Sequence, residues 1–179
     1  MAISTSTNRP RRQLLAAVSL IITALVFAGC ASKPAPKHAD QVVVRKSERT
    51  LQLLHDNQVM REYRIGLGNS PRGHKFEEGD ERTPIGNYIL DWRNPNSSFR
   101  KSIHISYPNE QDLVIARALG VSPGGMIMIH GQPNYITSKR ILKEYEGRDW
   151  TDGCIAVTNE EIEEIWRMVK NGTPIRILP

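Results

Sequence analysis

Two residues in this sequence have the side chains and the settings for acyl-transfer chemistry. Cys154 follows Gly153 in the stretch "RDWTDGCIAV" and begins the apolar run of residues 155–157. His130 ends the apolar stretch "GGMIMIH" and directly precedes Gly131. A cysteine nucleophile needs a base or a positive neighbour to form its thiolate near neutral pH. Both residues therefore stand at an edge of the expected core beside a glycine, a placement that suits a thiol–imidazole pair.

A purely structural interpretation of the same two residues stays open from their placement alone. A cysteine before an apolar run is often a small core residue, and a histidine that ends a strand is often a surface residue. The other histidines, His38, His55, His74 and His104, lack the spacing of zinc ligands, and no H-E-x-x-H or C-x-x-C motif occurs. We therefore expect neither a metal site nor a cofactor.

The other cysteine, Cys30, lies in an export signal. Three arginines (Arg9, Arg11 and Arg12) precede the apolar stretch 14–28, which is shorter than a membrane span of roughly 20 residues. The small residues before Cys30 resemble a bacterial lipoprotein signal, in which the cysteine is lipidated and becomes the mature N-terminus. A plain signal peptide with an incidental cysteine is the alternative. We expect a signal peptide over residues 1–29 and a membrane anchor at Cys30.

Export changes the meaning of the remaining thiol. If Cys30 is acylated, Cys154 has no partner within the chain, and an unpaired cysteine in an oxidising compartment is a reactive thiol or half of an intermolecular bridge. Ala31 stands where many lipoproteins kept in the inner membrane have aspartate. The expected location is therefore the cell envelope, on the outer membrane and facing the periplasm.

Composition divides the rest of the chain into a tether and one domain. The stretch "ASKPAPKHAD" lacks an apolar period, so residues 30–40 are predicted to be a flexible tether, and 41–179 supply one core. The whole chain has a net charge of +5, but the signal segment contributes three of the 24 basic residues and none of the 19 acidic ones. The remaining excess of two basic residues does not indicate a nucleic-acid partner.

The pattern of apolar residues predicts mostly strands with a few short helices. Alternation over 49–68, interrupted by "HDN", indicates a hairpin in which Val59, Tyr63, Ile65 and Leu67 share one face. Further strands are expected at 41–46, 85–92, 101–108, 124–130 and 173–178. Helices are expected at 109–120, 137–147 and 158–172, the last with Thr158 as N-cap and Glu161 as its capping-box partner.

The two chemical motifs together resemble those of a known family. "IHG" (129–131) and "TDGCIAV" (151–157) are similar to the His-Gly and Ser/Thr-x-Gly-Cys motifs of the L,D-transpeptidase, or YkuD-type, catalytic domain. "EGDERTPIGNYIL" (78–90) and "HISYPN" (104–109) also resemble stretches of that family. The resemblance covers roughly residues 41–179. It implies an α+β, mostly β fold, an L,D-transpeptidase-like β-sandwich with a few short helices packed against it.

The resemblance also implies roles for the residues of the two motifs. Cys154 would be the nucleophile and His130 its general base, with the imidazole oriented by the backbone carbonyl of Gly131. The thiolate would attack a peptidoglycan stem peptide and form a thioester acyl-enzyme. Backbone N–H groups around Gly153 would bind the oxyanion, and Thr151 would hydrogen-bond within the loop.

Three further residues are weaker candidates for substrate binding, namely His104, Arg148 and Trp150. Met126 and Met128 alternate before His130 and are expected to pack in the core.

The sequence leaves three functions open. The first is an acyltransferase that cross-links or remodels the cell wall, and the second is a hydrolase of the same fold that cleaves wall or wall-protein linkages. The third is a peptidoglycan-binding lipoprotein without activity. Ala156 occupies the position where many family members have arginine, so a cation that binds substrate or tunes the thiolate is missing. Neither the acceptor nucleophile nor the oligomeric state follows from the sequence.

Overall fold

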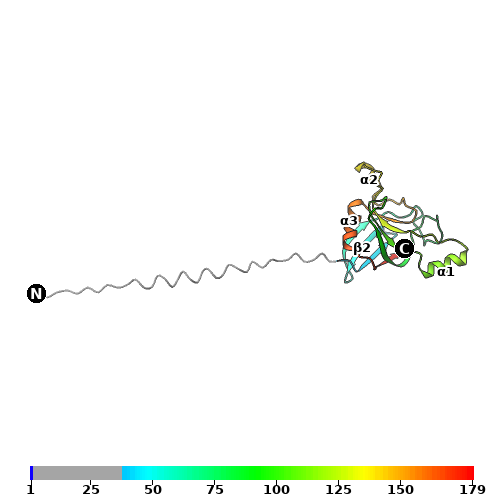
Figure 1. The fold of residues 1–179 in the computed structure, drawn as a ribbon, viewed down its shortest axis with the longest axis horizontal. Helices are drawn as coiled ribbons and strands as arrows, with labels where there is room; N and C mark the ends of the chain where they lie inside the picture. Colours follow the sequence, from blue (N-terminus) through cyan, green and yellow to red (C-terminus); the bar gives the residue numbers. More distant parts are fainter. Residues whose placement is uncertain (2–37) are drawn as a thin grey trace. The chain divides into compact units, whose positions relative to one another are not determined.

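The computed structural model describes Met1 and residues 38–179 (Figure 1). The strands are β1 (Gln41–Arg45), β2 (Thr50–His55), β3 (Gln58–Arg64), β4 (Gly86–Asn94), β5 (Ser102–Ile105), β6 (Met128–His130), β7 (Ile155–Ala156) and β8 (Thr173–Leu178). The helices are α1 (Glu110–Leu119), α2 (Lys139–Glu144) and α3 (Asn159–Met168). The predicted signal peptide, the lipidation site Cys30 and most of the predicted tether lie outside the described residues. Within those that are described, no helix is both long and apolar enough to cross a membrane.

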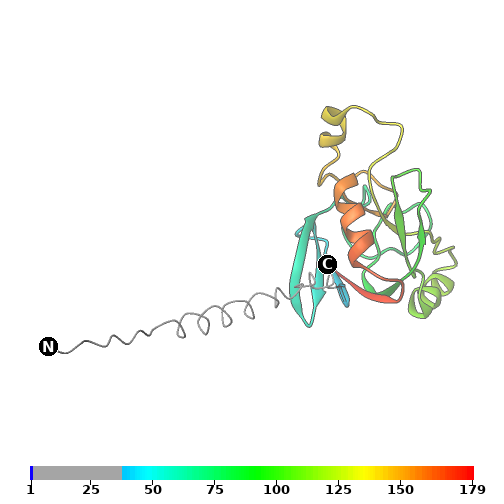
Figure 2. The ribbon, with the colours of Figure 1, turned by 60° about the vertical axis from the view of Figure 1, so that its left-hand side comes forward.

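The eight strands form one sheet in the order β3-β2-β1-β8-β4-β5-β6-β7. Neighbouring strands are antiparallel except for the pairs β1–β8 and β6–β7, which are parallel. Helix α3 lies against the sheet, whereas α2 projects from the folded part and buries none of its residues (Figures 1 and 2). This confirms the predicted α+β, mostly β fold with a few short helices.

The β2–β3 hairpin follows its predicted turn but not its predicted alternation throughout. Asp56 and Asn57, the two turn residues, both have positive φ angles of 51° and 60°, as a tight two-residue hairpin turn requires. A register shift between Leu53 and Leu54 places an extra residue in β3. As a result, Val59 is 53% exposed instead of sharing the buried face of Tyr63. That part of the prediction was wrong.

Helix α3 closes one side of the core. Thr158 accepts a hydrogen bond from Glu161 N–H while the Glu161 carboxylate accepts from Thr158 N–H, which confirms the predicted capping box. Ile162 and Ile165 are fully buried against the sheet. The helix ends at Met168, earlier than predicted, because Val169 turns to an extended conformation.

Two glycines after β3 bring the edges of the sheet together. Gly66 forms an antiparallel bridge with Ala156, and Gly68 forms a parallel bridge with Thr151, so the end of the hairpin pairs with the segment that carries Cys154. A Cβ atom on Gly66 would lie 2.0 Å from the carbonyl oxygen of Arg148. Only glycine permits this approach, and the sheet thus curls back onto itself at the predicted nucleophile.

Candidate active site

The loop before Cys154 is fixed by its own side chain and backbone. The buried hydroxyl of Thr151 donates to the carbonyl oxygen of Cys154 at 2.8 Å and accepts from Gly153 N–H at 3.2 Å. Gly153 has a φ of 127°, and a Cβ atom there would lie 2.7 Å from the carbonyl oxygen of Arg82. Thr151 and Gly153 therefore shape the loop. The Gly153 N–H is engaged, whereas within residues 38–179 the Cys154 N–H has no acceptor.

An ion pair anchors the start of the same loop. The Asp149 carboxylate accepts hydrogen bonds from Arg49 Nε at 2.9 Å and from Arg49 Nη2 at 2.6 Å, and also from Leu67 N–H at 2.9 Å. These contacts tie the loop to residues about 80 to 100 positions earlier in the chain. Asp149 carries no signal in the sequence other than its position just before the motif.

The imidazole ring of His130 is oriented by the backbone carbonyl of the next residue. Its Nδ1 atom lies 2.7 Å from the carbonyl oxygen of Gly131, and because a carbonyl can only accept, Nδ1 carries the hydrogen. The Nε2 atom is then left with a lone pair that can accept a proton. A Cβ atom on Gly131 would lie 2.8 Å from both Arg100 Cβ and Asn159 Oδ1, so this position also requires glycine.

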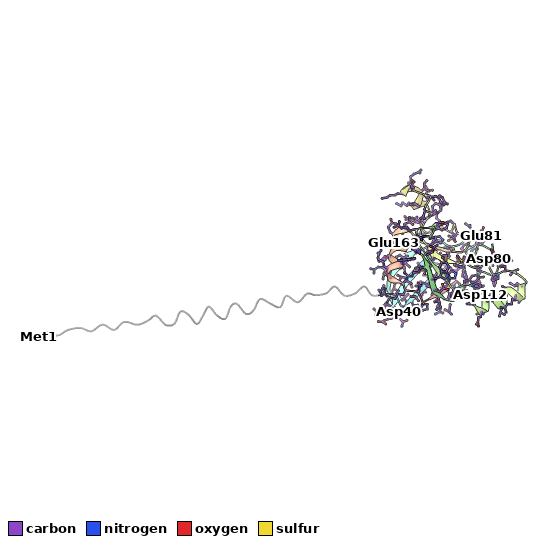
Figure 3. All side chains as sticks on the ribbon, viewed as in Figure 1. Met1, Asp40, Asp80, Glu81, Asp112 and Glu163 are labelled. Atoms are coloured by element: carbon purple, nitrogen blue, oxygen red, sulfur yellow. The ribbon has the colours of Figure 1, made fainter. Side chains whose placement is uncertain are left out.

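Two aromatic rings pack against the imidazole. The ring centroids of Phe99 and Trp150 lie 4.7 Å and 5.5 Å from that of His130, which is only 4% exposed. Phe99 comes from the loop between β4 and β5, and a lone aromatic residue in a loop has no spacing from which its role could be predicted. Glu163 of α3 (labelled in Figure 3) forms ion pairs with Arg100 and Lys101, the last two residues of that loop, at 2.8 Å and 2.7 Å.

The structure brings Cys154 and His130 into one pocket. The parallel β6–β7 pairing aligns Ile129 with Ile155, and the Met128 N–H donates to Cys154 Sγ at 3.4 Å. The pocket has a volume of about 350 Å³. Its walls are Asn94, Ser97, Ser98, Phe99, Ser102, Met126, Met128, His130, Trp150, Thr151, Asp152 and Cys154.

Burial shifts the pKa of both reacting groups toward their neutral forms. The pKa of His130 is lowered to about 4 by burial, which outweighs the Gly131 carbonyl that favours the charged ring. The pKa of Cys154 is raised to about 11 by burial, against the stabilising Met128 N–H. At neutral pH the free protein therefore holds a thiol and a neutral imidazole in one pocket, not a preformed ion pair, and the thiol lies 3.6 Å from the Met126 carbonyl oxygen.

The methionines before His130 do not both pack in the core. Met126 is 64% exposed and lines the pocket, and its backbone has a positive φ of 58°. This conformation also delays the start of β6 to Met128, whereas the sequence had suggested a strand from residue 124. Met128 is buried, yet it too reaches the pocket wall.

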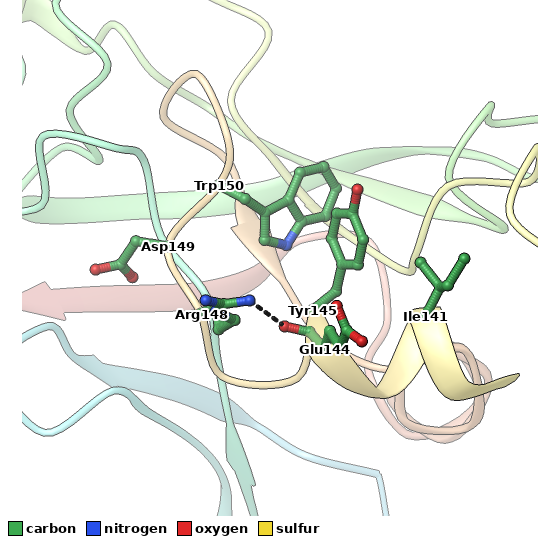
Figure 4. Close-up of a pocket in the computed structure, with 6 residues that line it drawn as sticks. All are labelled: Ile141, Glu144, Tyr145, Arg148, Asp149 and Trp150. Carbon is green, nitrogen blue, oxygen red and sulfur yellow. Dashed lines mark hydrogen bonds between the residues drawn. The ribbon is translucent and has the colours of Figure 1, made fainter. Parts of the chain in front are cut away.

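The three weaker candidates for substrate binding lie in different places. Trp150 lines the pocket of Cys154 and also a second pocket of about 400 Å³ (Figure 4). Arg148 lines only that second pocket, where its Nη1 donates to the Glu144 carbonyl oxygen at 3.4 Å. His104 lies outside both pockets and stacks on Trp92.

Metal ligands do not gather in the part of the chain that the structure describes. No group of three or more His, Cys, Asp or Glu side chains lies close enough together there to hold an ion. What that part offers instead is a nucleophilic sulfur, an imidazole with one free nitrogen and a pocket that opens onto both.

The family model described as YkuD, L,D-transpeptidase catalytic domain, matches residues 39–177. The Escherichia coli (strain K12) protein YafK, provisionally named an L,D-transpeptidase, is 30% identical over 179 residues, covering 89% of this chain and 64% of YafK. This chain thus spans less than two thirds of that relative's length.

Solved structures of similar proteins share the fold. The helical cell shape determining protein Pgp2 from Campylobacter jejuni superposes with a TM-score of 0.56 at 26% identity, covering 76% of this chain and 46% of Pgp2. An L,D-transpeptidase from Mycobacterium smegmatis superposes with a TM-score of 0.50 at 14% identity over 78% of this chain and 58% of that one, a likeness of fold alone.

Proposed function

The chain belongs to the YkuD family of L,D-transpeptidase catalytic domains, and we propose that it is a cysteine-dependent acyltransferase acting on peptidoglycan stem peptides. The observation that carries this proposal is the shared pocket of Cys154 and His130, in which the Gly131 carbonyl leaves His130 Nε2 free to accept a proton. A sulfur nucleophile beside a neutral base is the minimum that thioester chemistry needs.

The reaction begins with a neutral pair. Cys154 Sγ attacks the carbonyl carbon that precedes a D-amino acid, and the thiol proton passes to His130 Nε2 during the attack. The tetrahedral oxyanion is stabilised by the Cys154 N–H, which lacks an acceptor within residues 38–179. The C–N bond then breaks, and the imidazolium returns its proton to the departing amine.

The second half of the reaction repeats these steps in reverse. An amine of another stem peptide attacks the thioester, His130 takes its proton, and the Cys154 sulfur leaves and is reprotonated. Water in place of the amine would give hydrolysis, with a free carboxylate as product. The Phe99 and Trp150 rings pack against the imidazole and limit the access of water to it.

The same proposal includes a place in the cell envelope. Lipidation of Cys30, behind a signal peptide over residues 1–29 and joined by the tether of residues 30–40, would hold the catalytic domain of residues 41–179 beside the wall. Substitution of Cys30 by Ala should move the protein from the membrane fraction to the soluble fraction. Unchanged fractionation would refute lipidation without touching the chemistry at Cys154. The solved relative Pgp2 is described as a determinant of helical cell shape, and wall remodelling is the corresponding role we propose here.

Product analysis tests the proposed reaction. Purified disaccharide-tetrapeptide fragments of peptidoglycan are incubated with the full-length chain and with its Cys154→Ser variant. Cross-linked dimers formed by the unsubstituted protein alone would support transfer. Monomers shortened by their last residue, again dependent on Cys154, would assign hydrolysis instead. Unchanged fragments together with retained binding would leave only a wall-binding module.

A further inference from the structure

A bulge in β4 exposes a tryptophan close to the pocket. The β4–β5 pairing runs from Leu90–Ile105 to Arg93–Ile103, so Asp91 and Trp92 together face His104 and β4 carries one extra residue. Arg93 anchors the bulge from the opposite face, since its guanidinium lies 4.9 Å from the Trp166 ring and donates to the Trp166 carbonyl at 2.8 Å. The Trp92 side chain is left 37% exposed.

The exposed Trp92 ring is stacked on a histidine ring and lies next to a carboxylate. Trp92 stacks on His104 with a centroid distance of 4.7 Å and an interplanar angle of 16°. Asp91 Oδ1 lies 2.7 Å from His104 Nδ1 and accepts a hydrogen bond from the backbone N–H of Trp92 at 3.0 Å. Among the described residues, neither Asp91 Oδ2 nor His104 Nε2 has a hydrogen-bond partner. A fixed aromatic surface thus lies beside an unused carboxylate oxygen.

Trp92 and Cys154 lie at the two ends of one row of residues that crosses the neighbouring strands β4, β5, β6 and β7. His104 pairs with Met128, and Met128 is level with Cys154 because Ile129 pairs with Ile155. Since neighbouring strands are about 4.8 Å apart, His104 lies about 10 Å from Cys154 and Trp92 about 14 Å. Met128 lies between them and lines the pocket.

We infer that Trp92, His104 and Asp91 form a binding subsite for a sugar ring of the peptidoglycan glycan strand. The inference rests on the proposed function for the identity of the substrate. In a tetrapeptide stem whose last residue leaves, three residues separate the attacked carbonyl from the sugar. Three extended residues span about 10 Å, the estimated distance from Cys154 to His104, so the sugar that follows them reaches Trp92 about one strand farther on. The apolar face of a pyranose would stack on the free face of Trp92 while a hydroxyl donates to Asp91, and His104 supports both from behind.

The position of the subsite argues against an amine ligand. An ammonium could also bind above Trp92 beside the Asp91 carboxylate. However, an acceptor amine must reach the thioester carbon, and the Trp92 ring is about three strands away from Cys154. A group that binds at Trp92 therefore belongs to a part of the substrate that is far from the reacting bond, and the glycan end of a stem peptide is such a part.

Binding of a peptide-free sugar tests the inference without any need for turnover. A chitin-type oligomer of N-acetylglucosamine is titrated into the full-length chain by calorimetry. The Trp92→Ala variant should bind roughly tenfold more weakly or not at all, and Trp92→Tyr should retain most of the affinity. The control Tyr135→Ala removes an aromatic side chain that is 80% exposed but lines neither pocket, and it should bind like the unsubstituted chain.

The possible failures of this subsite and of the proposed reaction can be told apart. Cys154→Ser should bind the oligomer normally, because the sulfur takes no part in sugar recognition. The subsite is overturned if the unsubstituted chain does not bind the oligomer, if Trp92→Ala binds it equally well, or if N-acetyl-lysine amide displaces it. Loss of Cys154-dependent chemistry with intact sugar binding would instead overturn the acyltransferase and leave the subsite in place.

Discussion

The Nδ1 atom of His130 lies 2.7 Å from the carbonyl oxygen of the next residue, Gly131. In a Ser-His-Asp triad a separate carboxylate fixes the imidazole tautomer, but here the backbone does so. A neutral carbonyl stabilises the imidazolium less than a carboxylate would. This agrees with the lowered pKa of the buried His130 ring, and it favours a base that is charged only while the reaction proceeds.

Replacing Gly131 by Ala should displace the carbonyl that orients His130. The new Cβ atom would lie 2.8 Å from Arg100 Cβ and from Asn159 Oδ1, so the backbone must shift. We expect the rate of acylation at Cys154 to fall on the order of 10²-fold. Gly125→Ala is the matched control, because a Cβ atom there would have its nearest neighbour at 3.9 Å. Equal acylation rates in the two variants would contradict this role of Gly131.

Replacing Thr151 by Val should loosen the nucleophile loop without a change in side-chain volume. The substitution leaves the buried Gly153 N–H without an acceptor and the Cys154 carbonyl without its donor. We expect the free energy of unfolding to fall by about 1–3 kcal/mol. Thr151→Ser keeps the hydroxyl and should recover most of it. The check is urea unfolding of both variants, and a Val variant as stable as the Ser variant would count against the two bonds.

The raised pKa of Cys154 predicts how fast its thiol reacts with iodoacetamide. Burial raises this pKa to about 11, so alkylation of Cys154 should keep rising with pH beyond pH 9, by about tenfold per pH unit. Peptide mapping separates Cys154 from Cys30. A rate that is already constant between about pH 5 and pH 9 would reveal a preformed thiolate–imidazolium pair and contradict the neutral resting state.

His130 should make folding stability depend on pH in the acid range. Its folded-state pKa is about 4 against 6.5 in the unfolded chain, so between these values only the unfolded chain binds the proton. The contribution is complete above pH 6.5, and about 3 kcal/mol is lost as the pH falls to about 4. Urea unfolding of His130→Gln should show a shallower decline over this range than the unsubstituted chain. Parallel curves would contradict the lowered pKa.

Local signals in the sequence were sufficient to predict the helices whose ends carry clear capping residues. The Asn109 and Gly120 caps of α1 and the Thr158–Glu161 capping box of α3 all occur where they were predicted. Such signals depend on hydrogen bonds within a few residues, so no tertiary information is needed. The hairpin bulge that exposes Val59 has no comparable local marker, because a register shift depends on the partner strand.

The features of the site that could not be predicted from the sequence depend on contacts between residues far apart along the chain. The motif residues Cys154 and His130 were identified from their neighbours and from the family resemblance. By contrast, Phe99 and Gly66 matter only because the chain returns to place them against His130 and Arg148. Trp92 ends the expected strand 85–92, and its exposure depends on the β4 bulge, which in turn depends on the partner strand.

The intact mass of the full-length chain after brief exposure to a tetrapeptide stem peptide tests the proposed chemistry most directly. We predict a gain equal to the mass of the tetrapeptide minus that of the released amino acid, located on Cys154, removed by hydroxylamine as a thioester would be, and absent from Cys154→Ser. His130→Gln should form this adduct roughly 10²–10⁴-fold more slowly. An adduct on any other residue, or its formation at an undiminished rate without the imidazole, would contradict the proposal.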